Sequence, residues 1–378
     1  MRVRYRYRMW ALAVVLVVVI AACGGDTRIP SVGSYGARGD GVTDDTAAFL
    51  AAARAGPFRV PAGTYRVTDL VLPEGTTIHG AGDSSFIRGK VTVASRCTLV
   101  SLKVGAAGQS FTAAAKAQGV RCRDVTFIGG STDSAVVSLM LPCKNLAFTH
   151  CTIATGGGWN GVSILDHNGT IRDVTFDHCH FMSQGRMGFE CISRNLLNDR
   201  ATGNAVYQRV SLLDCVFEPQ GAEAVSFDGP PAVANCLIRG NVIKGAGIGR
   251  YPWDQGLEIN GPRNMTVNHN TFYACRGDIW NLEMHSAVDC GWLFSDNEID
   301  ASKSFQSVPM NAHSDCVSMS GVHGGVFARN SITSAAPGGP VAWMRDCNDN
   351  DWRTTTWHDA RGSAYSTPQQ VDCTGNRF

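Results

Sequence analysis

Eight short segments of the chain repeat one residue pattern, and this repeat constrains the fold more than any other feature. Each segment centres on a small residue, Cys or Asn, with a hydrophobic residue two positions later and, in seven of the eight, another three positions earlier. The central residues are Cys151, Cys179, Cys215, Asn241, Asn270, Asn297, Asn330 and Asn376. Most of them are roughly 26 to 36 residues apart, which is typical of the repeats of a solenoid.

The spacing within each segment predicts two short strands joined by a bend. Residues five and three positions before the centre share one side of a strand, because side chains alternate along a strand. The central residue and the residue two positions later share one side of a second strand, and the odd step between the two pairs requires a bend. Such coils close a core only by stacking, so the sequence predicts an all-β fold, a parallel β-helix of roughly ten coils.

The central positions have two further consequences. Stacked Asn amides are expected to hydrogen-bond along the axis, and the Cys residues at that position are expected to be buried free thiols. The last coil is expected to contain Asn376 and Phe378. The polar stretch 345–368, which includes Trp352 and Trp357, is expected to be a long loop before that coil.

The charge balance excludes one class of partner. The formal net charge is +1, whereas a nucleic-acid-binding surface needs an excess of basic residues. The chain also contains 42 Gly, and 17% of its residues are charged. This composition favours a turn-rich β protein that does not bind nucleic acid.

One helix is predicted before the repeats. Thr43, Asp44 and Asp45 are N-cap candidates for a helix that runs to about Ala55. Gly56 and the proline after it end the helix. A helix at this place can cover the open end of a β-helix, which would otherwise expose unpaired strand groups.

The start of the chain predicts export. Arginines at alternate positions precede an apolar run over residues 10–22 that is too short to span a membrane comfortably. The run ends in Ile-Ala-Ala-Cys at Cys23, which resembles the bacterial lipoprotein signal; an ordinary secretory signal is the alternative. We therefore expect a signal peptide over residues 1–22, a lipid-anchored linker over residues 23–32 and one β-helix domain over residues 33–378. The resemblance implies a membrane-anchored lipoprotein with lipid on Cys23.

The segment from Gly33 to Gly82 resembles the N-terminal part of the pectate-lyase-superfamily β-helix domain. The motifs that carry the resemblance are Tyr-Gly-Ala at 35–37, Gly-Asp-Gly at 39–41, Asp-Asp-Thr-Ala-Ala at 44–48, Val-Pro at 60–61, Gly-Thr-Tyr at 63–65 and Gly-Ala-Gly at 80–82. The family includes rhamnogalacturonase/epimerase-like proteins, polygalacturonase-like hydrolases and phage tailspikes. The resemblance implies a right-handed coil and does not select a reaction.

Acidic residues recur on the third strand of four consecutive coils. Strand alternation places hydrophobic neighbours inward and turns Glu190, Asp228, Glu258 and Glu283 outward. Asp166 is a weaker member of the same row. We expect these acids to lie in one exposed file about one strand spacing apart, where mutual repulsion raises the proton affinity of at least one of them.

A row of acids in a long groove favours action on a polysaccharide. Glycosidases use two carboxyl groups as acid and base or nucleophile, and a lyase can use acids to hold Ca²⁺ against a uronate. The sequence requires no cofactor and leaves Ca²⁺ open. The four acids are the catalytic candidates. The substrate-binding candidates are Asp166, Arg186, Trp159, Trp253 and His285.

Two readings of the acid row remain open. The first is an exported enzyme that cleaves an acidic, uronate-containing polysaccharide by lyase or hydrolase chemistry. The second is a carbohydrate-binding or adhesin-like β-helix without catalysis.

Three histidines, His150, His178 and His269, all fall one residue before a central position. They are expected to be solvated corner residues rather than metal ligands.

Overall fold

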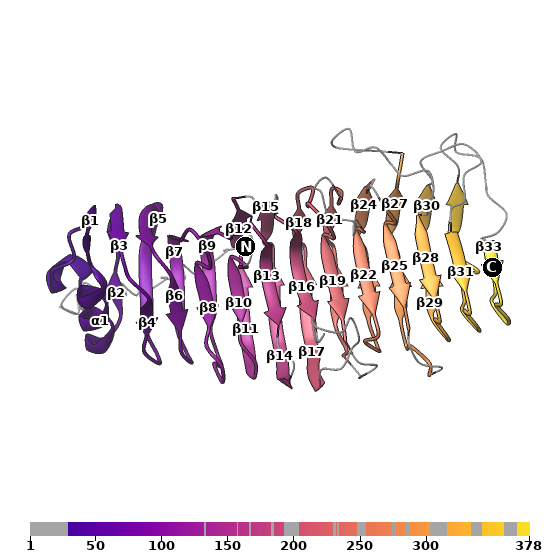
Figure 1. The fold of residues 1–378 in the computed structure, drawn as a ribbon, viewed down its shortest axis with the longest axis horizontal. Coiled ribbons are helices and arrows are strands. Elements are labelled where there is room, and N and C mark those ends of the chain that lie inside the picture. The colour runs from indigo at the N-terminus through magenta and orange to yellow at the C-terminus, as the bar shows by residue number, and fades with distance from the viewer. Residues whose placement is uncertain are drawn as a thin grey trace, which may run out of the picture.

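The repeat folds into stacked coils in the computed structural model. The structure describes residues 29–131, 134–156, 158–165, 168–182, 185–192, 204–229, 232, 234–247, 255–273, 275, 277–284, 288–302, 316–333, 342–358 and 369–378. All of the strand pairs that join successive coils are parallel, and they form two sheets of 21 and 12 strands. Figure 1 shows the strands side by side along one axis, as expected for a right-handed parallel β-helix.

Each coil contributes to both sheets. Sheet 1, with 21 strands, comprises β1 (Asp40–Asp44), β2 (Phe58–Arg59), β3 (Gly63–Arg66), β5 (Thr77–Arg88), β7 (Thr98–Gly105), β9 (Arg121–Gly129), β11 (Cys143–Thr149), β12 (Thr152–Thr155), β14 (Asn168–Asp177), β15 (His180–Met182), β17 (Asn204–Leu213), β18 (Val216–Phe217), β20 (Leu237–Arg239), β21 (Val242–Ile243), β23 (Thr266–Asn268), β24 (Thr271–Tyr273), β26 (Leu293–Ser295), β27 (Glu298–Asp300), β29 (Val326–Ala328), β30 (Ser331–Thr333) and β32 (Thr356–His358). In most coils two of these strands meet at the predicted bend.

Sheet 2 contains the third strand of each coil. Its 12 strands are β4 (Leu70–Leu72), β6 (Val91–Val93), β8 (Phe111–Ala113), β10 (Val137–Leu139), β13 (Asn160–Leu165), β16 (Met187–Ile192), β19 (Val225–Asp228), β22 (Leu257–Asn260), β25 (Trp280–Glu283), β28 (Val317–Ser320), β31 (Ala342–Arg345) and β33 (Gln369–Val371). The acids predicted as catalytic lie on four of them.

The predicted apolar columns form the core. Phe148 pairs with Phe176 in register, and their rings stack with centroids 4.5 Å apart. One bend further on, Phe181 and Phe217 stack in the same way at 4.3 Å. Because residues of the same kind stack on successive coils, the core is continuous along the axis.

The central positions behave as predicted. The side-chain amide of Asn241 donates to the side-chain oxygen of Asn270 (2.9 Å), Asn270 donates to Asn297 (3.0 Å), and Asn297 donates to Asn330 (2.9 Å). The Cys residues of the earlier coils are buried free thiols. The ladder satisfies polar groups that would otherwise be orphaned in the core.

The last coil differs from the expectation. Asn376 does not continue the ladder but lies beside Asn350, whose side-chain amide donates to it (3.0 Å). Thr355 takes the central position instead, and its hydroxyl accepts a hydrogen bond from Asn330 (3.3 Å). Phe378 is 37% exposed rather than a core residue. The expected final repeat is therefore displaced by five residues.

The predicted loop contains a coil. Trp352 is fully buried and stacks on Phe327 with centroids 3.8 Å apart, and Trp357 packs against it at 5.1 Å. The two tryptophans flank Thr355 at the template spacing. A Thr at the centre and polar neighbours hid this coil in the sequence.

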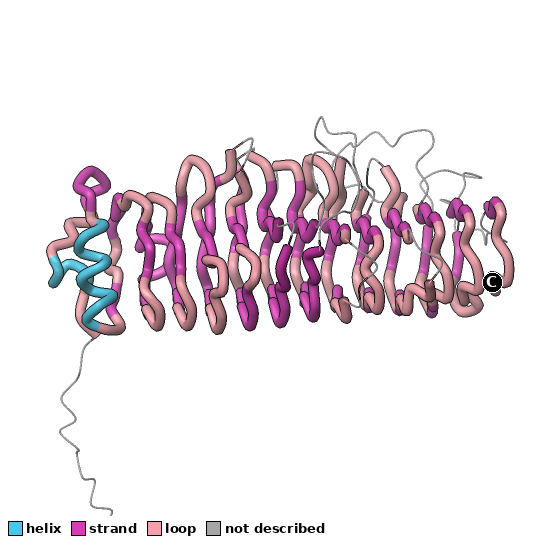
Figure 2. The backbone as a smooth tube through the Cα atoms, turned by 60° about the horizontal axis from the view of Figure 1, so that its bottom comes forward, coloured by secondary structure: helices cyan, strands magenta, loops and turns pink. Residues whose placement is uncertain are grey.

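The helix covers the N-terminal end of the stack. Helix α1 (Thr46–Ala55) begins and ends where predicted, and Figure 2 shows it in cyan over the first coils. Its Phe49 packs edge-on against Phe58 and Tyr65 at 5.8 and 5.6 Å. The carboxylate of Asp44 accepts from the amide of Thr46 (2.9 Å).

A short 3₁₀-helix, η1 (Val32–Tyr35), precedes β1. Among the described residues, no helix has the length and apolar character needed to cross a bilayer.

Candidate functional site

The four predicted acids lie on adjacent strands but not in one file. On β16, β19 and β22, Glu190 pairs in register with Ser226, and Ser226 pairs with Glu258. A serine therefore separates the two glutamates, which are two coils apart, or about 9.6 Å along the sheet. The expected continuous row of acids is wrong in this respect.

The other two acids form a parallel file two residues further along the strands. Asp228 on β19 pairs with Asn260 on β22, and Asn260 pairs with Glu283 on β25. Asp228 is buried, contrary to the expected exposure, whereas Glu283 is half-buried. The alternation of acids with Ser and Asn reduces the repulsion that a single file would create.

Glu190 is held by a dense set of polar contacts. Contrary to the expected exposure, only 2% of it is exposed. It accepts from Arg186 Nη1 (2.9 Å) and from the hydroxyl of Ser163 (3.1 Å). The side-chain amide of Asn160 also donates to it. Burial raises the pKa of Glu190, and the positive charge of Arg186 opposes that rise. The Arg186 guanidinium lies over the ring of Trp159, 4.6 Å from its centroid.

A fifth acid, Glu223, lies beside this group and was not predicted. It is 2% exposed, and burial raises its pKa to about 8, with a further contribution from the negative charge of Glu258. The charge of Arg186 acts in the opposite direction. Among the described residues, Glu223 Oε2 has no hydrogen-bond partner. A carboxyl in this state retains its proton at neutral pH.

Strand alternation explains why the sequence did not reveal Glu223. It lies two residues before Val225, which points into the core, so alternation assigns Glu223 to the core as well. The available signal was a glycine two residues earlier in each coil: Gly158 precedes Asn160, Gly185 precedes Met187 and Gly221 precedes Glu223.

These glycines bring the bends of successive coils into close contact. A Cβ on Gly221 would lie 2.0 Å from the carbonyl oxygen of Gly185, and a Cβ on Gly158 would lie 2.3 Å from the backbone of Gly130. Only glycine allows this approach. The bends therefore stack in register, which places Glu223 next to the strands that carry Glu190 and Glu258.

Glu258 is the more accessible acid of this group. It is half-buried and accepts a hydrogen bond from the hydroxyl of Ser226 (2.7 Å). Near it, Gln255 Oε1 and Asn260 Oδ1 are buried and have no hydrogen-bond partner among the described residues. Buried acceptors of this kind are commonly satisfied by a ligand or by water.

A hollow of about 250 Å³ adjoins the acids. It is lined by Gln109, Ser134, Ala135, Ser138, Leu139, Met140, Trp159 and Ser163. Trp159 and Ser163 link it to the acids, since the first contacts Arg186 and the second donates to Glu190. We call Glu190, Glu223, Glu258, Arg186 and Trp159 the acid site.

Several predicted residues lie outside the described part of the chain. These are Asp166, Trp253, His285 and Cys23. Of the remaining candidates, the structure brings Glu190, Glu258, Arg186 and Trp159 together, and Asp228 and Glu283 lie in the neighbouring file.

One group of side chains in the described part of the chain has the spacing of potential metal ligands. Within the described ranges, Asp177, His178 and Asp214 present ligand atoms that all lie within 4.8 Å of one another. His178 has a positive φ at the corner, as does His150, which agrees with the predicted solvated position. Asp177, which contacts His178 Nδ1 at 2.7 Å, raises the pKa of that imidazole. The acids of sheet 2 described here do not form such a group.

Known proteins resemble this chain in two ways. Residues 29–103 match the family model described as rhamnogalacturonase A/epimerase, pectate lyase-like. The pre-neck appendage protein of Bacillus phage phi29 is 52% identical over 59 residues, which is 15% of this chain and 7% of the phage protein. The chain thus spans only a small part of the length of its curated relatives.

Solved structures match nearly the whole chain. The A-module of mannuronan C-5 epimerase AlgE6 from Azotobacter vinelandii aligns over 92% of this chain and 93% of its own, with 15% identity and a TM-score of 0.51. PfbA, a surface adhesin of Streptococcus pneumoniae, aligns over 93% of both chains, with 13% identity and a TM-score of 0.53. At such identities the likeness establishes the parallel β-helix fold and no activity.

Proposed function

We propose that the protein hydrolyses glycosidic bonds of an acidic polysaccharide at the acid site. The observation that carries the proposal is Glu223, a buried carboxyl whose pKa is raised to about 8 beside the carboxyl group of Glu258. Glycoside hydrolysis requires one carboxyl that holds its proton and another that does not. Glu258, which is half-buried and accepts a hydrogen bond from Ser226, is the candidate for the second carboxyl.

The two groups would share the reaction as follows. Glu223 gives its proton to the glycosidic oxygen as the bond to the anomeric carbon breaks and the electron pair passes to that oxygen. Glu258 takes a proton from water, whose oxygen forms the new bond to the anomeric carbon. The products are two shorter chains, one of which has a new reducing end.

The rest of the acid site would position the sugar. The ring of Trp159 offers an apolar face next to the hollow, and sugars stack on such faces. Arg186 is fixed between that ring and Glu190, so it keeps one positive charge close to an acidic substrate. A protein of the same fold, the A-module of AlgE6, is a mannuronan C-5 epimerase, so acidic polysaccharides are the first substrates to test.

The test is a panel of uronate-containing and neutral polysaccharides assayed for new reducing ends. Glu223→Gln and Glu258→Gln are each expected to reduce the rate by about 100-fold or more, because general acid and base catalysis contribute this much. Glu74→Gln, which removes only the surface ion pair with Arg96, is the matched control and should leave the rate unchanged.

Two results would contradict hydrolysis. A product that absorbs as an unsaturated uronate would identify a lyase. Saturable binding without any cleavage, equal in wild type and Glu223→Gln, would identify a binding protein. Carbohydrate binding without cleavage is the second candidate function. It is favoured by the small size of the hollow beside Trp159, about 250 Å³, which suits recognition of a few sugars without chemistry.

We also propose that the protein is exported and anchored to a membrane through lipid on Cys23. The support is the resemblance of residues 1–23 to a lipoprotein signal. In a bacterial host, the wild type is expected in the membrane fraction, and Cys23→Ser is expected to leave it. An equal distribution of both proteins after fractionation would disprove the anchor.

A further inference from the structure

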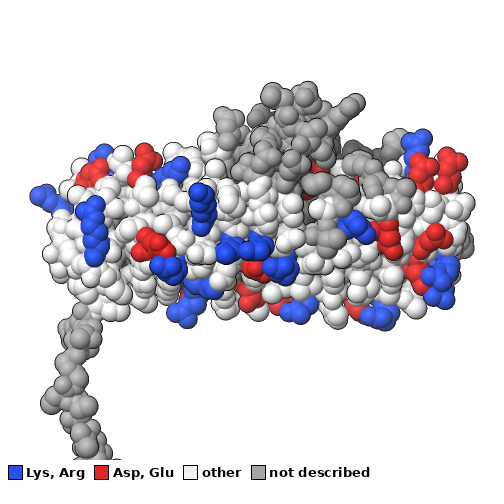
Figure 3. All heavy atoms as spheres, turned by 90° about the horizontal axis from the view of Figure 1, so that it is seen from below, with Lys and Arg blue, Asp and Glu red and all other residues white. Residues whose placement is uncertain are grey.

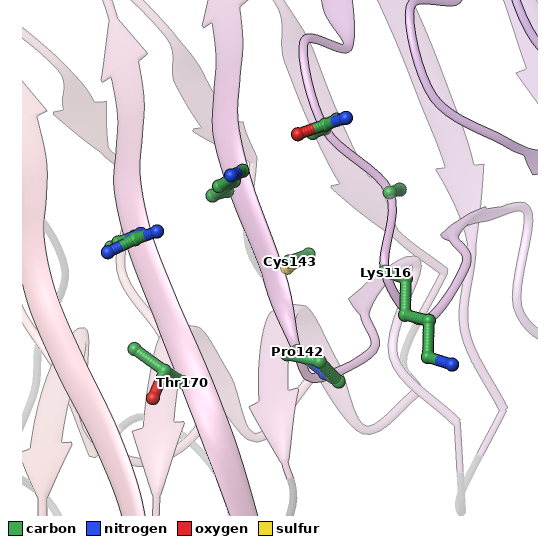
Figure 4. Close-up of a pocket in the computed structure, with 8 residues that line it drawn as sticks. Lys116, Pro142, Cys143 and Thr170 are labelled. Carbon is green, nitrogen blue, oxygen red and sulfur yellow. The ribbon is translucent and has the colours of Figure 1, made fainter.

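A second pocket has a lining separate from that of the hollow beside the acid site. It has a volume of about 430 Å³ and is lined by Lys116, Ala117, Gln118, Pro142, Cys143, Lys144, Thr170 and Arg172. These residues lie where the chain passes from β8 and β10 of sheet 2 into sheet 1, and in β14. Figure 4 shows Pro142 and Cys143 between Lys116 and Thr170.

Three cations surround this pocket on successive coils. Lys144 on β11 pairs in register with Arg172 on β14, so their side chains lie about one strand spacing apart. Gln118 bridges to Lys144 on the other side, and the amide of Lys116 donates to the carbonyl of Pro142 (2.5 Å). Ala117 and Cys143 are buried and form an apolar floor.

Within the described ranges, Lys116, Lys144 and Arg172 form no ion pair. Hydrogen bonds from Arg209, at 2.6 and 2.9 Å, lower the pKa of the Asp173 carboxyl, and the charges of Arg172 and Lys144 lower it further. Figure 3 shows Lys and Arg side chains along the underside of the molecule, over the middle coils and toward both ends, with Asp and Glu side chains among them.

The pocket also adjoins the hollow beside the acid site. Leu139 and Met140 line the hollow, and Pro142 and Cys143 line the pocket. Only Leu141 separates the two linings along the chain, and Met140 is 42% exposed between them. The turn after β10 therefore contributes residues to both linings.

We propose that Lys116, Lys144 and Arg172 form a second binding site that holds the acidic groups, carboxylate or sulfate, of a glycan chain. The proposal extends the proposed function, since the same chain would pass through the hollow to the acid site. Adjacent cations at one strand spacing suit a polymer that repeats its negative charge. The low net charge of the whole protein argues against a nucleic acid as the ligand.

The test uses a double variant, Lys144→Gln with Arg172→Gln. Glutamine is compatible with this file of sheet 1, because Gln208 pairs with Arg172. The control, Arg54→Gln with Arg239→Gln, removes the same charge from α1 and β20. Binding of polygalacturonate, a sulfated glycan, neutral dextran, inorganic sulfate and duplex DNA is measured by calorimetry at two salt concentrations.

The double variant is expected to lose about tenfold in affinity for both acidic glycans, with a weaker salt dependence. The control should change affinity less than about twofold, as expected for distant exposed charges. Comparing the two glycans shows whether carboxylate or sulfate is preferred. Equal binding by wild type and double variant would overturn the proposal, as would pocket-dependent binding of DNA tighter than that of the glycans.

The outcome is separable from that of the proposed function. Loss of glycan binding in the double variant without any cleavage by the wild type would support the pocket and reject hydrolysis. Cleavage that depends on Glu223, together with unchanged binding in the double variant, would do the reverse.

Discussion

Glu223 illustrates how burial changes the chemistry of one side chain. Its carboxyl lies below the surface, close to two other acids and to Arg186. Removal from water penalises the charged form, and the negative charge of Glu258 adds to this penalty, so the proton is retained well above the ordinary pKa of a glutamate. Glu190 experiences similar burial, but Arg186 and Ser163 offset part of it.

The raised pKa predicts a pH dependence of stability. Because the folded state binds this proton more tightly than the unfolded chain, the stabilisation is fully present below pH 4.5 and is lost as the pH rises to about 8. Glu223→Gln keeps the shape and removes the titration. We expect the free energy of unfolding of the variant to match that of the wild type near pH 4.5 and to exceed it above pH 8 by on the order of 5 kcal/mol.

Thermal and denaturant unfolding across this pH range measure the difference. Glu74→Gln serves as the control because its carboxylate is on the surface. Identical pH profiles for wild type and Glu223→Gln would show that the carboxyl is not protonated in the folded protein.

The asparagine ladder links neighbouring coils along the axis. Asn270 donates to the carbonyl of Ile238 (2.9 Å) and to Asn297, and it accepts from the backbone and side chain of Asn241. Each rung therefore satisfies groups on both adjacent coils. Buried backbone groups at the bend have no water to replace such a partner.

Replacement of one rung should be costly. Asn270→Ala leaves buried donors and acceptors on two coils unpaired, so we expect a loss of about 2 to 4 kcal/mol in the free energy of unfolding. Asn270→Thr should lose less, because Thr355 occupies the same position and its hydroxyl donates to the carbonyl of Phe327 (2.6 Å). Urea denaturation compares the two. Equal stability of wild type and Asn270→Ala would mean that the ladder contributes little.

In the whole molecule, the residues that stabilise the stack of coils are different from those that form the proposed binding sites. The core columns run the length of the axis, whereas the acid site and the basic pocket lie on the middle coils, on β13 to β22 and around β10, β11 and β14. Helix α1 covers the first coils, so the sheet edge at that end is not open for pairing with another chain. The shape leaves a long lateral surface, which suits a polymeric ligand.

The inward residues, the asparagine ladder and the bounds of α1 could be predicted from the chain alone, because each depends on local periodicity or on a local stop signal. Phe148, Phe181 and Asn270 follow directly from the repeat. The coil around Thr355 was missed, since its centre departs from Cys and Asn while its tryptophans keep the spacing.

Which acids become neighbours was decided by the register between coils. Glu190, Asp228 and Glu258 all point to the same side, as alternation requires, yet connections of different length shift alternate acids by two residues into separate files. The proton affinity of Glu223 depends on burial among side chains far apart in the sequence. The periodicity of the sequence predicts neither the register of the acids nor the proton affinity of Glu223, because both properties arise only when the coils stack.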